Sequence, residues 1–451
     1  MGCLSSKRPG CVCLDNGGKM KLGSRKLILD AAAAMLVCVA AFGSAAGQTA
    51  PAKKPAAAPA KKPAASGQAA PARRPAAAAA GPVMADRVYT NVKVLRGLTE
   101  DQFMDTMGFI ASALGTNCIF CHDNGIGGDT SARWKAFAAD TKPTKETARK
   151  MILMVNAINK QNFAGQKMVT CYSCHRSLED PPKVIPEMAA QYMAPVDSEP
   201  DAFTKQAPDS PTPDQILAKY IDAMGGATRV GNMKSYVAKG TYGGYDTDFA
   251  AVPMEIYAKA PDKRSMVMHT PFGERSEIFN GKDGWNATPD TSQVLPVLPI
   301  TGGRLTSAKA IAQFAFPTGI KDSLTRWIVS PEFTTSSAEP GAEDAGERQV
   351  YVLQGNTPRR LPIKLYFDKN TGLLVRIVSY VDTVLGLIPA QTDYSNYKDV
   401  NGIKMPFHWA QTWTDGKSVF DLTDVQVNAA VDDAKFGKPA APKLLTPPSS
   451  R

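Results

Sequence analysis

The chain contains CIFCH at residues 118–122 and CYSCH at residues 171–175. Both have the form C-x-x-C-H, which attaches a c-type haem: the two thiols bond to the haem vinyl groups and the adjacent imidazole becomes the proximal iron ligand. The chain has only eight cysteines and four histidines. The motifs predict two covalently bound haems c, held by Cys118, Cys121, Cys171 and Cys174, with His122 and His175 as proximal ligands.

Other uses of paired cysteines explain less of the pattern. Zinc ribbons place their C-x-x-C motifs about 15–20 residues apart, whereas 49 residues lie between Cys121 and Cys171. Structural disulfides suit an exported protein, but neither zinc nor a disulfide explains a histidine after both motifs. A thioredoxin-like redox site needs a βαβ setting, which the surrounding sequence does not indicate.

Length and charge limit the classes of protein to consider. A chain of 451 residues exceeds one ordinary hydrophobic core, so two or more domains are expected. Residues 1–80 carry the whole formal net charge of +10, which leaves the rest neutral. The sequence therefore gives no indication of nucleic-acid binding.

The N-terminus resembles an export signal. Basic residues up to Lys26 precede a 12-residue apolar run at 31–42, and small residues at 44–46 offer a cleavage site. We therefore predict a signal peptide over residues 1–46, with Met20 as a possible true start. The apolar run is shorter than the roughly 20 residues of a membrane span, although an uncleaved anchor or lipidation at Cys38 would attach the N-terminus to a membrane.

Composition then changes along the chain. Residues 47–82 are almost entirely Ala, Pro, Lys and Arg and predict a disordered tether, because such a segment cannot bury a core. An α-rich dihaem cytochrome c domain is predicted at 83–196. Its first helix starts after Thr99 and ends at Gly115, and its second covers about 144–159. Residues 197–212 form a polar linker.

Residues 213–439 predict a mainly antiparallel β domain, a curved sheet or half-barrel with a few helices, followed by a tail at 440–451. Helices are expected at 214–224 and 307–316. Short runs of β-forming residues separated by turn sequences indicate the strands. They lie at 235–242, 254–259, 264–269, 276–280, 349–354, 363–367, 373–380, 405–412 and 418–427.

The sixth iron ligand is expected to be methionine. The other two histidines, His269 and His408, both lie in the β region. Methionine at the sixth position raises the haem potential and suits electron transfer. The residues alone leave four candidates, on the helices before the two motifs: Met104, Met107, Met151 and Met154. Each could equally fill space in a core.

Residues 98–177 resemble the cytochrome c subunit of photosynthetic reaction centres. The resemblance rests on Met107, the run SALGTNCIFCH at 112–122, ARKM at 148–151, and VTCYSCHR at 169–176. It implies that Met107 ligates the first haem and Met151 the second, with Met154 as the alternative. Unlike that four-haem subunit, this chain has one pair of motifs and a large β region.

Residues 213–439 resemble, more weakly, the curved-sheet fold of outer-membrane lipoprotein-sorting and carrier proteins. The shared features are turns and aromatics such as GKDGW at 281–285, LYFD at 365–368 and GIKMPF at 402–407. The resemblance implies a hydrophobic concavity of the kind that holds acyl chains in those proteins.

These observations favour an exported dihaem cytochrome c that carries electrons rather than an enzyme. Its partners would be redox proteins, such as a membrane reaction centre or another membrane electron-transfer complex. It would act in the periplasm or at the periplasmic face of the cell envelope. The alternatives are a dihaem peroxidase and a lipid-binding or scaffold module with redox-sensing haems.

Overall fold

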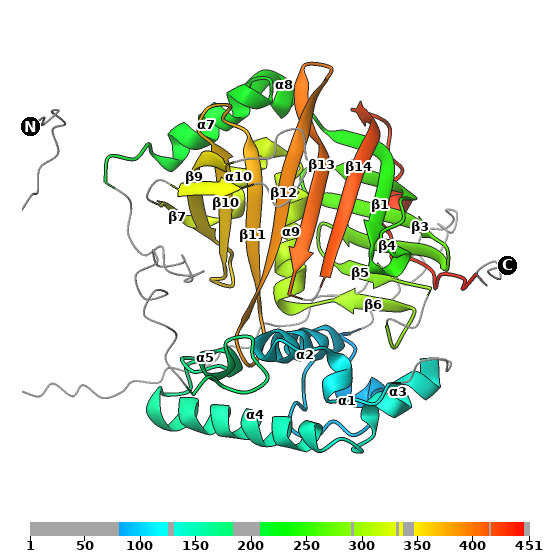
Figure 1. Ribbon diagram of the computed structural model, residues 1–451. Coiled ribbons are helices and arrows are strands. Elements are labelled where there is room, and N and C mark those ends of the chain that lie inside the picture. Colours follow the sequence, from blue (N-terminus) through cyan, green and yellow to red (C-terminus); the bar gives the residue numbers. More distant parts are fainter. Residues whose placement is uncertain are drawn as a thin grey trace, which may run out of the picture. The chain divides into compact units, whose positions relative to one another are not determined.

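The structure is a computed structural model that describes residues 81–124, 130–183, 208–289, 293–330, 333–336, 347–414 and 416–445 (Figure 1). Residues 77–451 form one compact unit. The predicted signal peptide, nearly all of the tether and most of the linker lie outside the described residues. The domain boundaries given above therefore remain predictions.

A helical region precedes the sheet in the chain. Its elements are α1 (Ala85–Val88), α2 (Glu100–Leu114), the 3-10 turn η1 (Cys118–Phe120), α3 (Thr130–Ala138), α4 (Pro143–Asn162) and α5 (Cys171–His175). Both predicted helices are present. The second is slightly longer than predicted, because Pro143 occupies the first turn, where its missing N–H costs nothing.

Local sequence accounts for the bounds of α2. The Gln102 side chain accepts a hydrogen bond from the Thr99 backbone N–H at 3.2 Å, which caps the helix start. Gly115 ends the helix with φ 64°, a left-handed conformation that favours glycine. A Cβ at Gly115 would also collide with the backbone of Ser177. The end of α2 is thus held close to the end of the second motif.

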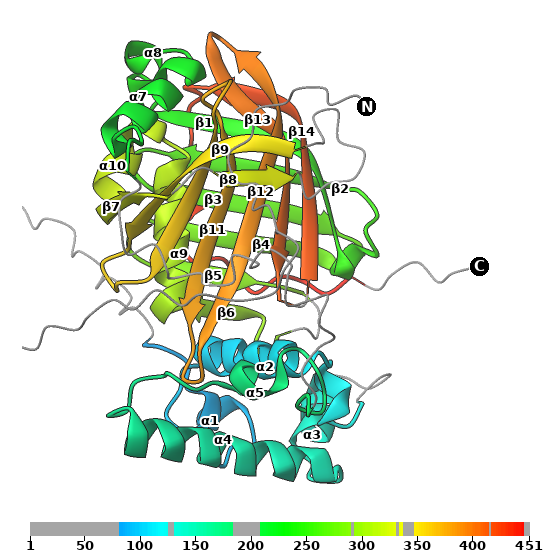
Figure 2. The same ribbon diagram turned by 60° about the vertical axis from the view of Figure 1, so that its left-hand side comes forward.

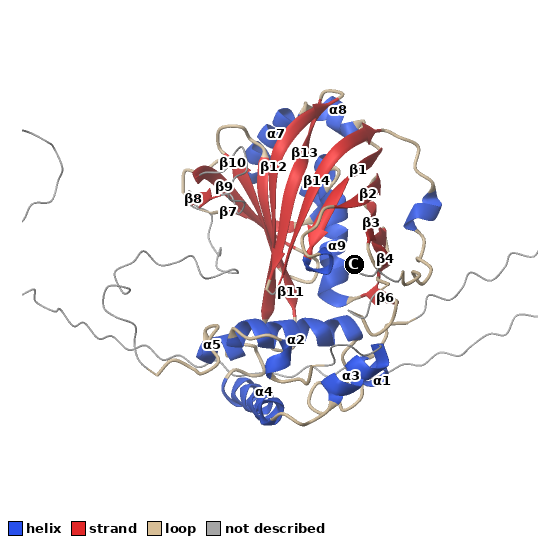
Figure 3. Ribbon diagram, turned by 45° about the vertical axis from the view of Figure 1, so that its right-hand side comes forward, coloured by secondary structure: helices blue, strands red, loops and turns tan. Residues whose placement is uncertain are grey.

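The rest of the unit is built on one 14-stranded antiparallel sheet. The strand order is β6-β5-β4-β3-β2-β1-β14-β13-β12-β11-β10-β9-β7, with β8 also paired to β9. The first and last strands, β1 and β14, therefore pair in the middle of the sheet. Figures 2 and 3 show that the sheet is strongly curved. The predicted curved antiparallel sheet is confirmed.

The strands have the following bounds: β1 Ser235–Gly244, β2 Val252–Lys259, β3 Lys263–Thr270, β4 Gly273–Asn280, β5 Gly284–Ala287, β6 Val297–Ile300, β7 Thr325–Val329, β8 Phe333–Ser336, β9 Glu347–Asn356, β10 Pro362–Asp368, β11 Leu374–Asp382, β12 Leu387–Val400, β13 Ile403–Trp413 and β14 Gly416–Val427. All nine predicted strands are present. The prediction missed β5, β6, β7, β8 and β12.

Helices α7 (Pro213–Met224), α8 (Ala227–Gly231), α9 (Gly302–Phe314) and α10 (Ile320–Ser323) accompany the sheet. Helix α9 contacts β3, β4 and β11 and lies within the curve of the sheet (Figure 3). Its predicted start was wrong by five residues, because the helix begins directly after Thr301. The main hydrophobic core joins the inner face of the sheet to α7 and α9.

Polar contacts join the helical region to the sheet region. The backbone N–H of Thr301 donates to Asp101 at 2.5 Å, and Arg304 Nε donates to Asp105 at 2.7 Å. Asp101 and Asp105 lie on α2 and are almost fully buried. Helix α2 is therefore tied directly to the start of α9.

Candidate haem sites

The first motif forms a tight turn after α2. The backbone N–H groups of Cys121 and His122 both donate to the Cys118 carbonyl, at 3.3 and 3.0 Å. This 3-10 turn brings the two cysteines and the histidine close together within five residues.

The His122 ring has a defined orientation. Its Nδ1 lies 2.6 Å from the carbonyl oxygen of Phe137, and the two rings stack with centroids 5.2 Å apart. A carbonyl only accepts, so Nδ1 carries the proton and Nε2 keeps its lone pair. Burial lowers the pKa of His122, which also favours the neutral ring. His122 therefore presents Nε2 as a metal ligand, with the backbone partner typical of such histidines.

A cavity of about 160 Å³ lies beside this ring. Met107, Cys118, Cys121 and His122 all line it, so the structure brings together the four groups predicted for the first haem. Met104 lines it as well. The other walls are mainly apolar and aromatic, and include Leu95, Phe103, Ile110, Leu114, Trp134 and Phe137.

One polar atom in this cavity wall has no partner. Trp134 Nε1 is buried and has no hydrogen-bond acceptor among the described residues. A buried donor without an acceptor costs about 1–3 kcal/mol. Lys93, Lys145 and Arg149 line the same cavity and share the carboxylate of Asp140. An apolar cavity with a free donor and several cations fits a haem, whose body is apolar and whose propionates are anionic.

The thiols are in a form that fits covalent attachment. All four motif cysteines are free, so none is taken up by a disulfide. Across the described ranges, no three His, Cys, Asp or Glu side chains approach closely enough to hold a metal ion.

The second motif forms helix α5. Ser177 donates its backbone N–H to Ala113 of α2 at 3.0 Å. On the other side, Asn159 of α4 holds the backbone of Val169, with bonds of 2.7 and 2.9 Å. Cys171 is buried at 7% exposure, whereas Cys174 is exposed. The motif is thus fixed between α2 and α4.

His175 repeats the arrangement of His122. Its Nδ1 lies 3.1 Å from the Leu178 carbonyl oxygen and 3.0 Å from that of Glu179. Nδ1 is again the donor, and Nε2 keeps its lone pair. The carbonyl partner of His122 lies 15 residues along the chain, and their hydrogen bond is partly buried. The partners of His175 lie only three and four residues along the chain, and their hydrogen bonds are exposed to solvent.

The predicted distal ligands of the second site are less enclosed. Met151 is 37% exposed and Met154 is 43% exposed on α4, and neither lines the first cavity. Other exposed apolar side chains on α4, in the segment before the second motif, or within or just after the motif are Leu153, Met168, Tyr172 and Leu178. So much exposed apolar surface fits a site that a flat apolar group would cover. The geometry does not choose between Met151 and Met154.

Sequence reasoning missed two functional groups of the first site. Trp134 and the Phe137 carbonyl both come from α3, which was not predicted. The spacing of Trp134 and Phe137, three residues apart and before Pro143, was the available signal for a short helix with one aromatic face.

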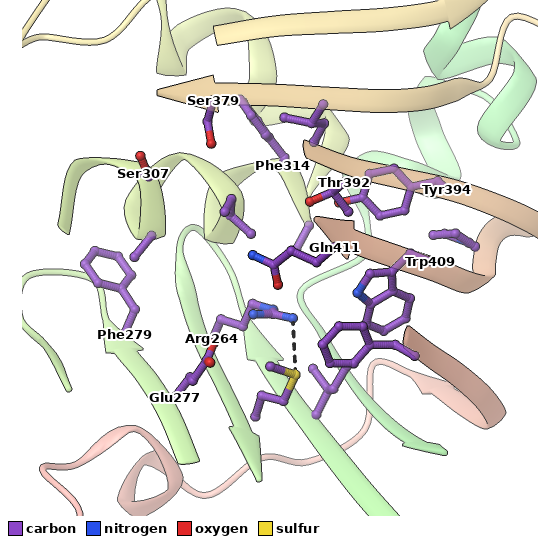
Figure 4. A pocket seen from close by; sticks show the side chains of 18 of the residues that line it. Arg264, Glu277, Phe279, Ser307, Phe314, Ser379, Thr392, Tyr394, Trp409 and Gln411 are labelled. Atoms are coloured by element: carbon purple, nitrogen blue, oxygen red, sulfur yellow. Dashed lines mark hydrogen bonds between the residues drawn. The ribbon is translucent and has the colours of Figure 1, made fainter. Parts of the chain in front are cut away.

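A separate cavity of about 330 Å³ lies within the sheet region (Figure 4). Its wall is largely apolar, with Phe314 from α9 and Trp409 from β13. Arg264 lies in it, and Arg264 Nη2 donates to the Met266 sulfur at 3.8 Å. Gln411, Thr392 and Ser379 add polar groups to the same wall, as Figure 4 shows. Neither His269 nor His408 lines this cavity.

The family model for the photosynthetic reaction centre cytochrome C subunit matches residues 46–231, which include both motifs. Three proteins named photosynthetic reaction center cytochrome c subunit match as well. They are 31% identical in Roseobacter denitrificans, 33% in Thermochromatium tepidum and 32% in Rubrivivax gelatinosus, over 111, 102 and 109 residues. The predicted resemblance of this segment is confirmed.

The matches are partial on both sides. They cover 23%, 22% and 23% of this chain and 28%, 22% and 26% of the three relatives. The chain thus spans about a quarter of the length of the curated relatives that it matches.

Solved structures match the sheet region. A LolA superfamily protein from Nitrosomonas europaea is 16% identical, covering 51% of this chain and 99% of its own, with a TM-score of 0.32. A DUF1329 family protein from Desulfovibrio piger is 13% identical, covering 50% and 96%, with a TM-score of 0.33. At these TM-scores the likeness supports no statement about function.

Proposed function

We propose that this chain is a c-type cytochrome that binds two haems covalently and transfers electrons. The arrangement of the two motif histidines carries this proposal. His122 and His175 lie 53 positions apart in the printed sequence, yet both direct Nδ1 to a backbone carbonyl. Both therefore leave Nε2 free, which is what a proximal haem ligand requires.

Each site residue has a distinct role in this proposal. Cys118 and Cys121 hold the first haem by thioether bonds, and Cys171 and Cys174 hold the second. Met107 is the distal ligand of the first site, where it lines the cavity opened by the motif. Met151 is the distal ligand of the second, with Met154 as the alternative.

The bound haem supplies one-electron chemistry, and the protein sets its potential. Methionine ligation and an apolar, water-poor setting both raise a haem potential. The Phe137 carbonyl fixes the ring of His122 and keeps its donor nitrogen in place. Electron transfer of this kind needs no acid–base residue. In this proposal the chain therefore carries electrons rather than catalysing a reaction of a substrate.

The partners follow from the role of a carrier. We propose redox proteins at the periplasmic face of the cell envelope, among them a reaction centre or another membrane electron-transfer complex. The names of the matched relatives and the predicted signal peptide support this location. In the described part of the chain, no helix has both the length and the apolar character to cross a membrane.

The test is a redox titration of the full chain matured in the periplasm, with haem quantified as the pyridine haemochrome. We expect two low-spin haems per chain and the weak red absorption band of methionine-ligated ferric haem. Met107→Ala and Met151→Ala should each remove part of that band. A high-spin haem would support a peroxidase, and the absence of covalent haem would overturn the proposal.

A second candidate function rests on the sheet cavity. Its volume of about 330 Å³ and largely apolar wall fit an elongated apolar molecule such as an acyl chain. Organic extraction of the purified full chain, followed by mass spectrometry, tests this. Lipid recovered in molar proportion from the wild type, and lost in the cavity-wall variant Phe314→Arg, would support it. A lipid-free protein that binds no fatty acid would exclude it.

A further inference from the structure

The turn between β11 and β12 has a fixed shape. The Thr383 backbone N–H donates to the Gly386 carbonyl at 2.8 Å, and the Thr383 hydroxyl donates to the same oxygen, also at 2.8 Å. The hydroxyl oxygen accepts from the backbone N–H groups of Leu385 and Gly386, at 3.2 and 3.1 Å. The turn thus satisfies its own polar groups, which allows it to be buried in an apolar setting.

The tip of this hairpin, residues 383–388, inserts into the helical region (Figure 2). Leu385 is 2% exposed, and it packs with Ile388 in one cluster with Phe109, Ala113 and Cys171. Gly386 is required here: a Cβ would lie 2.6 Å from the Phe109 ring and 3.3 Å from Thr170. The hairpin therefore approaches both α2 and the residue before the second motif.

Polar contacts hold the tip in place. Lys167, four residues before the second motif, forms an ion pair with Asp382. Lys167 Nζ also donates to the Thr383 carbonyl at 2.6 Å. The segment leading to the second motif is therefore fixed to the hairpin on its polar side as well as on its apolar side.

The position of Cys171 determines which haem the hairpin contacts. A thioether bond would join Cys171 Sγ directly to the haem edge, so whatever encloses Cys171 also lies near that edge. Leu385 and Ile388 share one buried cluster with Cys171, and Gly386 lies against Thr170, the residue directly before it. No residue of the hairpin tip is among those that line the first cavity.

We infer that the β11–β12 hairpin is part of the second haem site and raises the reduction potential of the second haem by excluding water from its Cys171 edge. This rests on the proposed function. Ferric haem carries one more positive charge than ferrous haem, and burial in an apolar setting disfavours the more highly charged form. Leu385 and Ile388 are thus positioning residues that the sheet region supplies to the second site.

The test compares Leu385→Ala with Leu365→Ala in the full chain. Leu365 is fully buried in β10 and lies outside the cluster around Cys171, so it controls for the loss of core methyl groups. Potentiometric titration should show a lower second-haem potential in Leu385→Ala alone. At a fixed ambient potential, we expect the ratio of reduced to oxidised second haem to fall about tenfold. This corresponds to a decrease of about 59 mV in its one-electron reduction potential. The two haems are distinguished with Cys118→Ser/Cys121→Ser, which retains only the second.

A second variant perturbs the contact without creating a cavity. Gly386→Ala adds a methyl group against the Phe109 ring and should push the tip away, again lowering only the second potential. Unchanged second-haem potentials in both variants, or equal shifts of both haems, would overturn the inference. Absence of covalent haem at Cys171 and Cys174 in the wild type would instead refute the proposed function.

Discussion

The two C-x-x-C-H motifs share their sequence pattern and the orientation of their histidines, but their surroundings differ. Cys118, Cys121 and His122 line a largely apolar cavity built from residues 89–152, although Cys118 is itself exposed. The second motif has one buried cysteine, an exposed cysteine and exposed methionines nearby. The motif sets which group can be attached, whereas the surroundings set how much water reaches it.

The origin of the enclosing residues differs as well. The first cavity is formed by neighbours in sequence, from α2, α3 and α4 and the loops between them. The second motif depends on contacts such as Lys167 with Asp382, which are 215 residues apart. The first site should therefore respond to changes in the helical region, and the second to changes in both regions.

Removal of each haem is the strongest test of this difference. Cys118→Ser/Cys121→Ser and Cys171→Ser/Cys174→Ser should each halve the haem content, from two to one per chain, by pyridine haemochrome. The first pair should lower the Tm more, because a haem held against the largely apolar wall of a cavity buries more apolar surface in the folded state. Equal losses of Tm would contradict the difference in enclosure.

The distal ligand of the second haem is the next test. We expect Met151→Ala to lower the second-haem potential by on the order of 0.1 V, since axial ligands tune haem potentials over about 0.8 V. Met154→Ala serves as the matched control on the same helix. If only Met154→Ala lowers the potential and removes the red absorption band, Met154 is the ligand.

A smaller effect is expected at the unpartnered indole of the first cavity. Trp134→Phe keeps an aromatic ring but removes the buried donor. If this donor serves a propionate, its loss should raise the propionate pKa by about one unit, since such hydrogen bonds contribute about 1.5–3 kcal/mol. The pH at which the first-haem potential changes should then be higher, and the pH profile of the second haem should be unaffected. Trp285→Phe in β5 is the control, and an unchanged pH profile would refute the role.

The smallest effect concerns a buried carboxyl beneath the first cavity. Glu100 accepts a hydrogen bond from Tyr89, a cavity residue, at 2.6 Å, and burial raises the pKa of Glu100 above its ordinary value. A raised folded-state pKa means that the charged form costs stability at neutral pH, and that this cost disappears as the pH falls through that pKa. Glu100→Gln should therefore raise the free energy of unfolding at neutral pH, but not in acid.

Chemical denaturation across about pH 4 to 7, in steps of about one pH unit, measures this change in the free energy of unfolding. The exposed Glu146, which pairs with the buried Arg149, provides the matched Glu→Gln control. A gain that persists undiminished in acid would show that ionisation of Glu100 is not its cause.

Sequence reasoning succeeded where local chemistry determines structure. Thr99, Gln102 and Gly115 define the two ends of α2, and their roles depend only on neighbouring backbone. Runs of β-forming residues between turn sequences likewise identified strands such as β2, whose residues alternate between buried and less buried positions. The motifs alone nominated His122 and His175, but not the carbonyl groups that orient them.

Strand β12 shows why the rest was missed. Pro389 and Asp393 are not typical of a strand, yet they lie in one of the longest strands of the sheet. Asp393 is stabilised there by Arg376 of the neighbouring strand. Such pairing between strands, like the approach of Gly386 to Phe109 and Thr170, depends on tertiary structure and leaves no local pattern.

The β11–β12 hairpin has one more consequence. Val381 and Ala390, on either side of the tip, line the sheet cavity, whereas Leu385 and Ile388 share a buried cluster with Cys171. A molecule in the cavity that displaces these strands would change the affinity of the second haem for an electron. Thermodynamic linkage then requires the reverse: reduction would change the affinity for that molecule by the same free energy. Under the proposed function, the hairpin would thus couple ligand binding in the sheet cavity to reduction of the second haem.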